Sequence, residues 1–192
     1  MATSQRKMLI QMSGAPGAGK STMAKLLQRS IGGLVIDHDV IRSAILENNV
    51  PFELAAKQAY NLQWVFTREV VRQGLSVIID SPCNFREAID QGQKIAADHD
   101  LVYWYVECKV DDIDLLDRRL RTRPPMKSQR TAVDQPPEAA RMMTPTTEEQ
   151  KAQFIRWMKT PCRPQQNVII VDTSGDLENT KNDILAQILS AE

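Results

Sequence analysis

The sequence lacks any long hydrophobic run, and no apolar stretch approaches the roughly 18 residues needed to cross a bilayer. Its first residues, 1–7, are polar and contain no hydrophobic signal region. The absence of both features argues against a membrane partner and against secretion. We therefore expect a cytoplasmic protein.

Excess charge and cysteine are also lacking. The 24 Lys and Arg residues balance 24 Asp and Glu residues, so no global field attracts a polyanion, and nucleic acid is disfavoured as a partner without being excluded. Cys83, Cys108 and Cys162 are too few and too widely spaced for a disulfide framework or a zinc site. We expect reduced cysteines with packing roles.

The 192 residues suit a single domain with one core, and their pattern is that of an α/β protein. Apolar runs typical of buried parallel strands alternate with amphipathic helical patterns, which predicts βαβ units with helices on both faces of a sheet. Strands are predicted at 7–12, 34–37, 75–80, 101–108 and 167–171. Helices are predicted at 21–29, 40–47, 52–72, 86–98, 111–121, 147–159 and 177–189.

The alternation breaks between residues 123 and 145. This stretch contains five prolines and has no apolar period. We predict an exposed, mobile loop there.

The most specific motif is a glycine-rich stretch between the first predicted strand and the first predicted helix. It matches G-x-x-x-x-G-K-[ST], in which glycines let backbone N–H groups converge on phosphate oxygens. The lysine can reach the β and γ phosphates, and the next hydroxyl can coordinate Mg²⁺. The motif and the residue after it are Gly14, Ala15, Pro16, Gly17, Ala18, Gly19, Lys20, Ser21 and Thr22. We predict that the chain binds a nucleoside triphosphate with magnesium.

A second polar group, Asp37-His38-Asp39, follows the second predicted strand, and Arg42 comes one helical turn later. Ligands bind open parallel sheets at this edge. A carboxylate there can take the proton of a substrate hydroxyl, while the arginine holds an anionic group of that substrate. Either aspartate could instead cap the next helix. The sequence leaves open which of them is the base, and His38 could face solvent or the core.

The third predicted strand ends in Asp80, where the second acidic residue of a phosphate-loop site is expected. Asp80 can orient the water shell of Mg²⁺ held by Ser21, and Asn84 and Arg86 can reach the substrate. Helix capping by Ser81 or Asn84 is the competing interpretation.

The densest basic cluster, Arg118-Arg119-Leu-Arg121-Thr-Arg123, opens the proline-rich stretch. Arginines on a closing helix can neutralise charge that develops on a transferred phosphoryl group. Arg119 and Arg123 are four residues apart and share a helical face, so we favour these two. Arg118 and Arg121 could simply form a solvated basic face.

These motifs resemble the small P-loop kinases of the zeta-toxin, chloramphenicol-phosphotransferase and polynucleotide-kinase type, an AAA-like kinase domain. The similarity covers nearly the whole chain, through GAPGAGKST, DHDVIR, VIIDSPCNFRE, RRLRTR and VIIVDT, and DSPCNFRE is most similar to fungal members. The resemblance implies a P-loop NTPase three-layer sandwich with strand order 2-3-1-4-5 and a lid at about 111–147. It also implies that Asp39 is the general base with Arg42 as the substrate-binding arginine, and that Arg119 and Arg123 are the lid arginines.

The sequence departs from that group in two ways. His38 separates two acidic residues that are often adjacent in the group, and the proline-rich stretch matches no substrate-recognition element. We therefore expect an ATP-dependent kinase that phosphorylates a hydroxyl of a small molecule. A 5′-hydroxyl polynucleotide kinase and a nucleotide-dependent switch with little catalysis are the alternatives. The acceptor, the preference for ATP or GTP and the oligomeric state stay open.

Overall fold

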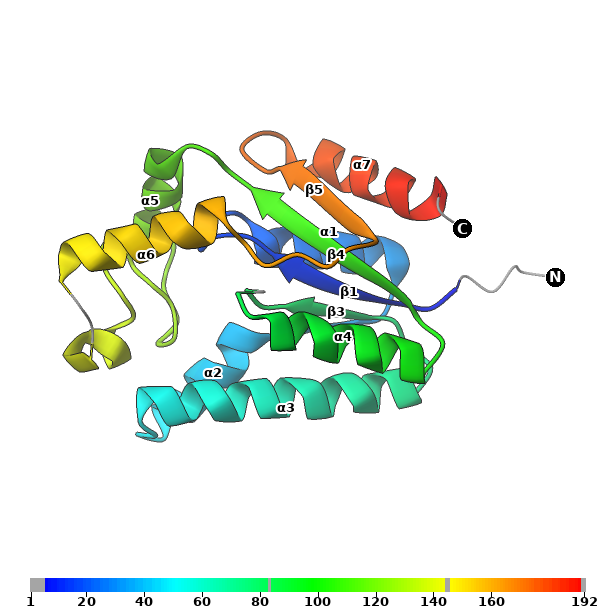
Figure 1. The fold of residues 1–192 in the computed structure, drawn as a ribbon, viewed down its shortest axis with the longest axis horizontal. Helices are drawn as coiled ribbons and strands as arrows, with labels where there is room; N and C mark the ends of the chain where they lie inside the picture. The colour runs from blue at the N-terminus through cyan, green and yellow to red at the C-terminus, as the bar shows by residue number, and fades with distance from the viewer. Residues whose placement is uncertain (1–5, 83, 144–145, 191–192) are drawn as a thin grey trace.

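A parallel sheet of five strands runs through the centre of the protein, in a computed structural model that describes residues 6–82, 84–143 and 146–190 (Figure 1). The strands lie in the order β2-β3-β1-β4-β5, which confirms the predicted order. They are β1 (Met8–Ser13), β2 (Leu34–Asp37), β3 (Val77–Asp80), β4 (Val102–Lys109) and β5 (Val168–Asp172).

Helices cover both faces of this sheet. Helices α1 and α7 lie on one face, and α3 and α4 lie on the other (Figure 1). The helices are α1 (Lys20–Ile31), α2 (His38–Glu47), α3 (Phe52–Arg72), α4 (Arg86–Asp98), α5 (Ile113–Thr122), α6 (Thr147–Lys159) and α7 (Leu177–Ser190), with a short 3₁₀ helix η1 (Glu138–Met143). The architecture is the expected three-layer sandwich.

Strand β1 explains why both faces need a cover. All six of its residues are buried, and successive side chains point to opposite faces of a sheet. Met8, Ile10 and Met12 belong to the core against α1 and α7, whereas Leu9 belongs to the core against α3 and α4. A parallel strand that is buried on both sides needs a helical layer on each face of the sheet.

The carboxyl ends of the strands share one edge, and α2, α5, α6 and η1 stand beyond it (Figure 1). None of the helices in the described part of the chain is long and apolar enough to cross a membrane. Cys108 and Cys162 carry free thiols, Cys108 in the core and Cys162 partly buried, while Cys83 lies outside the described residues.

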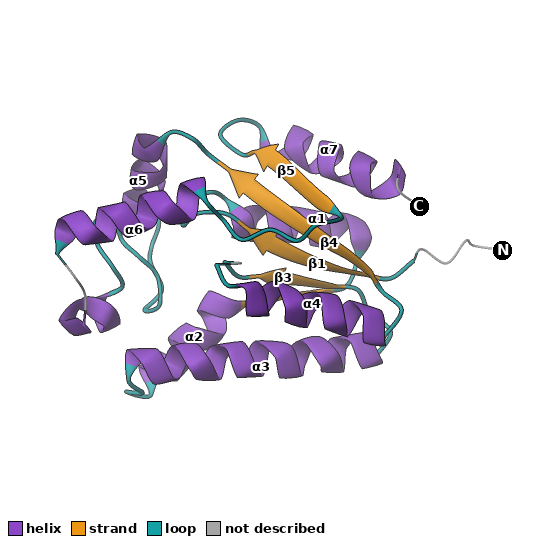
Figure 2. Cartoon of the chain, viewed as in Figure 1, coloured by secondary structure: helices purple, strands orange, loops and turns teal. Residues whose placement is uncertain are grey.

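Most predicted elements lie within two residues of the observed bounds, but the prediction for residues 123–145 is wrong in one respect. The stretch is largely loop and lies beside α6 (Figure 2), yet it is not uniformly exposed. Ser128, Gln129, Arg130, Ala132 and Val133 are buried, and the stretch contains η1. Hydrogen bonds to α2 and α6 hold it in place, and such tertiary contacts leave no apolar period in the sequence. Residues 144–145 lie outside the described part.

Gly33, in the turn before β2, and Gly74, in the turn after α3, should differ in how well they tolerate alanine. Gly33 has φ +87°, and a Cβ built there would lie 2.2 Å from the Ser76 carbonyl oxygen, whereas Gly74 has φ +74° with no atom within 4 Å of its Cβ. Gly74→Ala should therefore lower the free energy of unfolding by about 1 to 2 kcal/mol, from the strain of a left-handed backbone alone. Gly33→Ala should cost a further 1 to 3 kcal/mol or so, because backbone must move. Denaturant unfolding of both variants tests this, and equal losses would contradict it.

Candidate active site

A cavity of about 650 Å³ lies at the carboxyl edge of the sheet. Its wall is built from the glycine-rich loop, α2, α3, the end of β3, α5, α6 and the segment 128–140. The predicted site residues that line it are Pro16, Gly17, Gly19, Lys20, Ser21, Thr22, Asp39, Arg42, Asp80, Asn84, Arg119 and Arg123. The predicted site residues outside its lining are Gly14, Ala15, Ala18, Asp37 and Arg86. The fold thus brings distant parts of the sequence to one hollow.

The glycine-rich loop between β1 and α1 forms the floor on one side. Gly14 has φ +131°, and a Cβ there would lie 2.2 Å from the carbonyl oxygen of Cys108, so only glycine fits. Helix α1 begins at Lys20 with no acidic residue in its first turn and no side-chain cap, which leaves its first N–H groups available to an anion. The Lys20 ammonium donates to the carbonyls of Gly14 (2.9 Å) and Ala15 (3.1 Å).

The two aspartates at the end of β2 have different partners. Asp37 Oδ1 accepts from the backbone N–H groups of Asp39 (2.8 Å) and Val40 (3.2 Å), so Asp37 caps α2. Asp39 Oδ2 accepts from Gln129 Nε2 at 2.9 Å, and Asp39 Oδ1 accepts from the Ser128 hydroxyl at 3.3 Å. The helix-capping alternative therefore describes Asp37, while Asp39 lines the cavity with its carboxylate held by side chains.

Asp80, at the end of β3, is a buried carboxylate with 4% of its surface exposed. Burial, and then the negative charge of Asp37, raise the pKa of its carboxyl from 3.8 to about 6, while Lys20 and a hydrogen bond with Ser21 favour the ionised form. Its Oδ2 atom accepts no hydrogen bond from any described residue. Buried oxygens usually have a partner, so this atom is available to a further ligand.

The four arginines of the basic cluster separate into two pairs. Arg119 donates to the carbonyls of Thr173 (2.9 Å) and Gly17 (3.4 Å), which sets it over the glycine-rich loop. Burial lowers the pKa of Arg123, which also lines the cavity. Arg118 and Arg121 are exposed and form ion pairs with aspartates on or near α5, as a solvated face does.

The remaining substrate candidates are not all in the cavity. The Arg42 guanidinium lies 3.8 Å from the ring centroid of Phe52, and Asn84 lines the cavity. Arg86 is exposed, pairs with Asp90 at 3.1 Å and donates to the Arg163 carbonyl at 3.1 Å. Arg86 therefore lies apart from the other candidates.

Several lining residues were missed from the sequence. Ser128, Gln129 and Arg130 belong to the stretch that we expected to be exposed, and a Ser-Gln-Arg run in a proline-rich segment carries no signal of its own. His38 also lines the cavity but is buried: it is 2% exposed, its ring centroid lies 4.2 Å from that of Tyr60, and burial lowers its pKa to about 4. His38 is therefore neutral at neutral pH.

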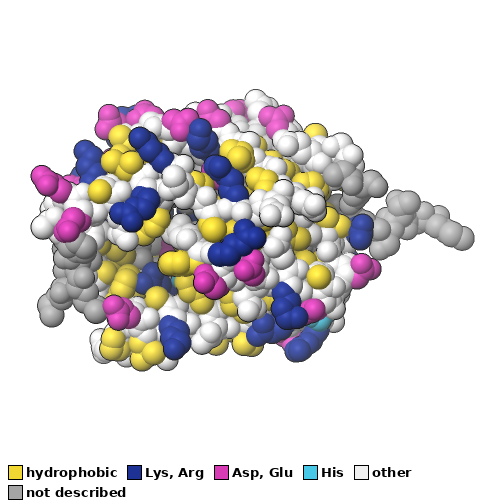
Figure 3. Space-filling model, in the orientation of Figure 1, with side chains coloured by type: hydrophobic (Ala, Val, Ile, Leu, Met, Phe, Trp, Pro, Cys, Tyr) yellow, Lys and Arg dark blue, Asp and Glu magenta, His cyan; other side chains and the backbone are white. Residues whose placement is uncertain are grey.

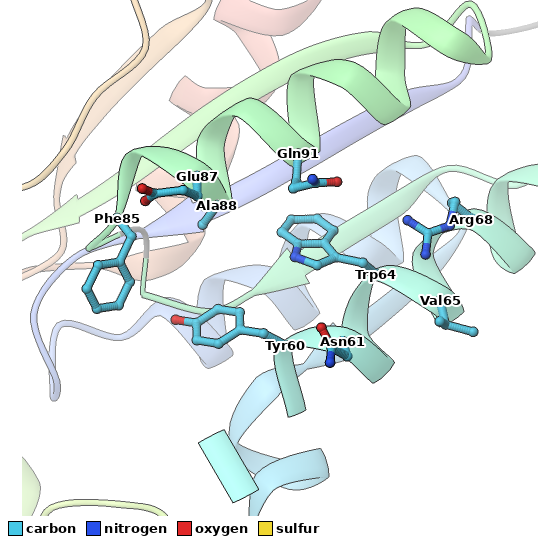
Figure 4. A pocket seen from close by; sticks show the side chains of 9 residues that line it. All are labelled: Tyr60, Asn61, Trp64, Val65, Arg68, Phe85, Glu87, Ala88 and Gln91. Atoms are coloured by element: carbon cyan, nitrogen blue, oxygen red, sulfur yellow. The ribbon is translucent and has the colours of Figure 1, made fainter. Parts of the chain in front are cut away.

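A second hollow of about 640 Å³ lies between α3 and α4 (Figure 4). Tyr60, Trp64 and Phe85 contribute aromatic rings to it, and Tyr60 and Phe85 also line the first cavity. Its charged lining residues are Arg68 and Glu87. Of these two cavities between described residues, the first combines several basic groups with two carboxylates, so it is the candidate active site.

The fold is shared with solved kinase structures. A gluconokinase from Sinorhizobium meliloti 1021 is 14% identical with a TM-score of 0.62, over 98% of this chain and 95% of that one. An APS kinase from Mycobacterium tuberculosis, solved with AMPPNP and APS, is 15% identical with a TM-score of 0.57, over 97% and 99%. A shikimate kinase from Acinetobacter baumannii, in complex with shikimate, is 16% identical with a TM-score of 0.55, over 97% and 95%.

No curated protein matches the sequence. The structural likeness establishes the fold, which is that of small P-loop kinases, as the motifs predicted. A family model described as an AAA domain matches residues 9–161, which include the glycine-rich loop, both acidic strand ends and the arginines of α5. The chain belongs to this family, AAA_33.

Proposed function

We propose that the protein is an ATP-dependent kinase that transfers the γ-phosphoryl group to a hydroxyl of a small molecule. The observation that carries the proposal is Asp39, a carboxylate in the same cavity as Lys20 and the glycine-rich loop. A proton acceptor beside a phosphate cradle is what transfer to an alcohol requires. The solved kinases of the same fold include enzymes named for gluconate, APS and shikimate, which are small molecules.

The donor half of the site would be the loop Gly14 to Thr22. Its backbone N–H groups and the start of α1 would hold the phosphates of ATP, and Lys20 would leave the Gly14 and Ala15 carbonyls to reach the β and γ phosphates. Arg119 and Arg123 would neutralise the charge that develops on the transferred group.

Magnesium fits the same end of the cavity. Ser21 and Asp80 offer a hydroxyl and a carboxylate, the oxygen ligands that Mg²⁺ prefers, and Asp80 Oδ2 lacks a partner among the described residues. No group of three or more His, Cys, Asp or Glu within the described ranges could hold a metal by itself. This suits an ion that keeps water and phosphate ligands, and when bound it would neutralise charge on the β and γ phosphates.

The acceptor half would centre on Asp39. As the acceptor O–H bond breaks, its proton would pass to the Asp39 carboxylate, and the oxygen would form a bond to the γ phosphorus. The bond from that phosphorus to the bridging oxygen would break, with its electron pair leaving on ADP. Ser128 and Gln129 would orient the carboxylate through the hydrogen bonds that they donate to it.

Two other functions have weaker support. Arg42 would suit a nucleic acid end, but basic and acidic side chains are interspersed on the face shown in Figure 3, with no continuous basic track there. A nucleotide-dependent switch needs no base to activate an acceptor, so Asp39 with its two donors argues against that function.

An ADP-release screen against hydroxyl metabolites tests the proposed activity directly. At least one compound should raise ADP release above basal hydrolysis in the presence of Mg²⁺ and ATP. Lys20→Met should lower that turnover by roughly 100- to 1000-fold, because a cationic group on the transferred phosphate is lost. A 5′-hydroxyl oligonucleotide belongs in the same screen. Phosphate on its end, with no metabolite phosphorylated, would favour the polynucleotide kinase instead.

Asp39→Asn should separate chemistry from nucleotide binding. Asparagine keeps the shape and an acceptor oxygen for Gln129, but it cannot take the acceptor proton. We expect kcat to fall roughly 100- to 10,000-fold while the Kd for ATP, measured by calorimetry, changes little. Asp114→Asn, an exposed aspartate in the first turn of α5, is the matched control and should be neutral. Full activity in Asp39→Asn would remove Asp39 from the mechanism.

Asp80→Asn should stabilise the protein while impairing Mg²⁺-dependent turnover. The carboxyl pKa is raised from 3.8 to about 6 by folding, so the folded state binds the proton more tightly and stability falls as pH rises from about 4 to about 6. This difference corresponds to about 3 kcal/mol. The free energy of unfolding of the variant should exceed that of the unmodified protein by up to about 3 kcal/mol above pH 6, and by little near pH 4. Denaturant unfolding across this pH range measures the gain, and a gain independent of pH would contradict the assignment.

A further inference from the structure

Arg130 is a buried cation without an ion-pair partner. Only 6% of its surface is exposed, and it lines the candidate active site. None of the ion pairs between described residues includes it. Buried arginines are normally paired, because removing a charge from water is costly unless an opposite charge compensates it.

The hydrogen-bond partners and ring neighbours of Arg130 are neutral. The charge of Asp134 favours its cationic form, but among the described residues Asp134 forms its ion pair with Arg121, at 3.5 Å. Its Nη2 donates to the Val133 carbonyl (2.9 Å) and to Gln150 Oε1 (3.1 Å), and its guanidinium carbon lies 5.7 Å and 5.6 Å from the rings of Phe154 and Trp157. Burial lowers its pKa to about 10, so the side chain is still a cation at neutral pH. No described residue accepts a hydrogen bond from Nη1. The guanidinium is thus fixed in orientation, and no carboxylate of the described residues is in ion-pair contact with it.

Arg42 is a second, partly buried cation in the same cavity, and the charge of Asp39 favours its cationic form. Its guanidinium lies over Phe52, its Nε atom is buried without a hydrogen-bond partner among the described residues, and it joins no ion pair between them. The cavity lining contains Lys20 and four arginines against the carboxylates of Asp39 and Asp80. The donor half proposed above uses Lys20, Arg119 of α5 and Arg123, the residue after α5. That assignment leaves Arg42 and Arg130 for the acceptor half.

Arg130 is also tied to the proposed base through its neighbour in the chain. Gln129 donates a hydrogen bond to Asp39 of α2, and Arg130 donates one to Gln150 of α6. Two consecutive residues of the chain are therefore a hydrogen-bond partner of the proposed base, Gln129, and a cation, Arg130. An acceptor held by Arg130 would have its hydroxyl placed relative to Asp39 by the same short piece of backbone.

We propose that Arg130, together with Arg42, binds a fixed anionic group of the acceptor, so that the acceptor is a hydroxyl compound that also carries a carboxylate, phosphate or sulfate. An anion there supplies a counter-charge in direct contact and takes up the free donors of the guanidinium, as oxyanions do with arginine. The hydroxyl part of this inference rests on the proposed kinase function, whereas the anion site itself does not.

Anion binding can be measured without knowing the acceptor. Trp157 lies beside Arg130 and reports on it. Inorganic phosphate and, separately, sulfate would be titrated into the protein saturated with Mg²⁺ and AMPPNP, so that the glycine-rich loop is already filled. We expect a saturable change in tryptophan fluorescence that is lost in Trp157→Phe. Arg130→Gln should raise the Kd for the anion at least tenfold, and Arg130→Lys should raise it less.

A merely structural role for Arg130, joining its segment to α6, would give a different result. Arg130→Gln would then lower the unfolding temperature but leave the anion affinity of the folded protein unchanged, which would overturn the proposal. Arg156→Gln, an exposed arginine on α6, is the matched control for loss of one positive charge and should bind the anion as the unmodified protein does. Anion affinity reduced equally in both variants would also overturn it.

Matched acceptor pairs test the substrate class. Each hydroxy acid would be compared with its amide, and each phosphorylated or sulfated alcohol with its uncharged parent, in the ADP-release assay. The charged member should be at least tenfold better in kcat/KM, and Arg130→Gln should raise its KM and remove the preference. If the neutral compound of a pair were phosphorylated equally well, the proposed kinase function would be supported and the proposed anionic class of acceptor would be refuted. Anion binding lost in Arg130→Gln with no acceptor found would support the site and refute the kinase.

Discussion

Parallel pairing of β1 with β3 on one side and β4 on the other is the constraint on which the site depends. It aligns the carboxyl ends of the strands, so the loop after β1, the carboxylate of β3 and the end of β4 meet at one edge. The contact is close enough that Gly14 leaves no room for a side chain beside the Cys108 carbonyl. The phosphate-binding loop is therefore shaped as much by β4 as by its own glycines.

The cavity at this edge concentrates charge that the rest of the fold does not neutralise. Asp80 is buried with an unpartnered oxygen and a raised pKa, and Arg42, Arg123 and Arg130 are cations whose pKa is lowered by burial. Such groups lower the stability of the folded state, since charges prefer water. Violations of the usual packing rules of this kind gather at functional sites, where a ligand supplies the missing partners.

The segment from Ser128 to Arg130 joins the two sides of the cavity. Ser128 and Gln129 hold Asp39 of α2, and Arg130 holds Gln150 of α6. These contacts are between side chains far apart in sequence, and they involve polar residues in a stretch without regular structure. A proline-rich composition indicates only the absence of a helix or strand. It does not predict burial, which here depends on the side chains of α2 and α6 that the loop contacts.

The sequence by itself determined the fold and located the glycine-rich loop that the proposed donor half uses. Alternating apolar runs and amphipathic helices, with a glycine-rich turn after β1, are local patterns that physical chemistry ties to one architecture, and the strand order and most element bounds agree with them. Only the tertiary structure assigned Asp37 to the cap of α2, set Arg86 outside the cavity and brought Arg130 into it. The reason is that a cap, a surface ion pair and a buried cation use the same residue types, and only the neighbours in space distinguish them.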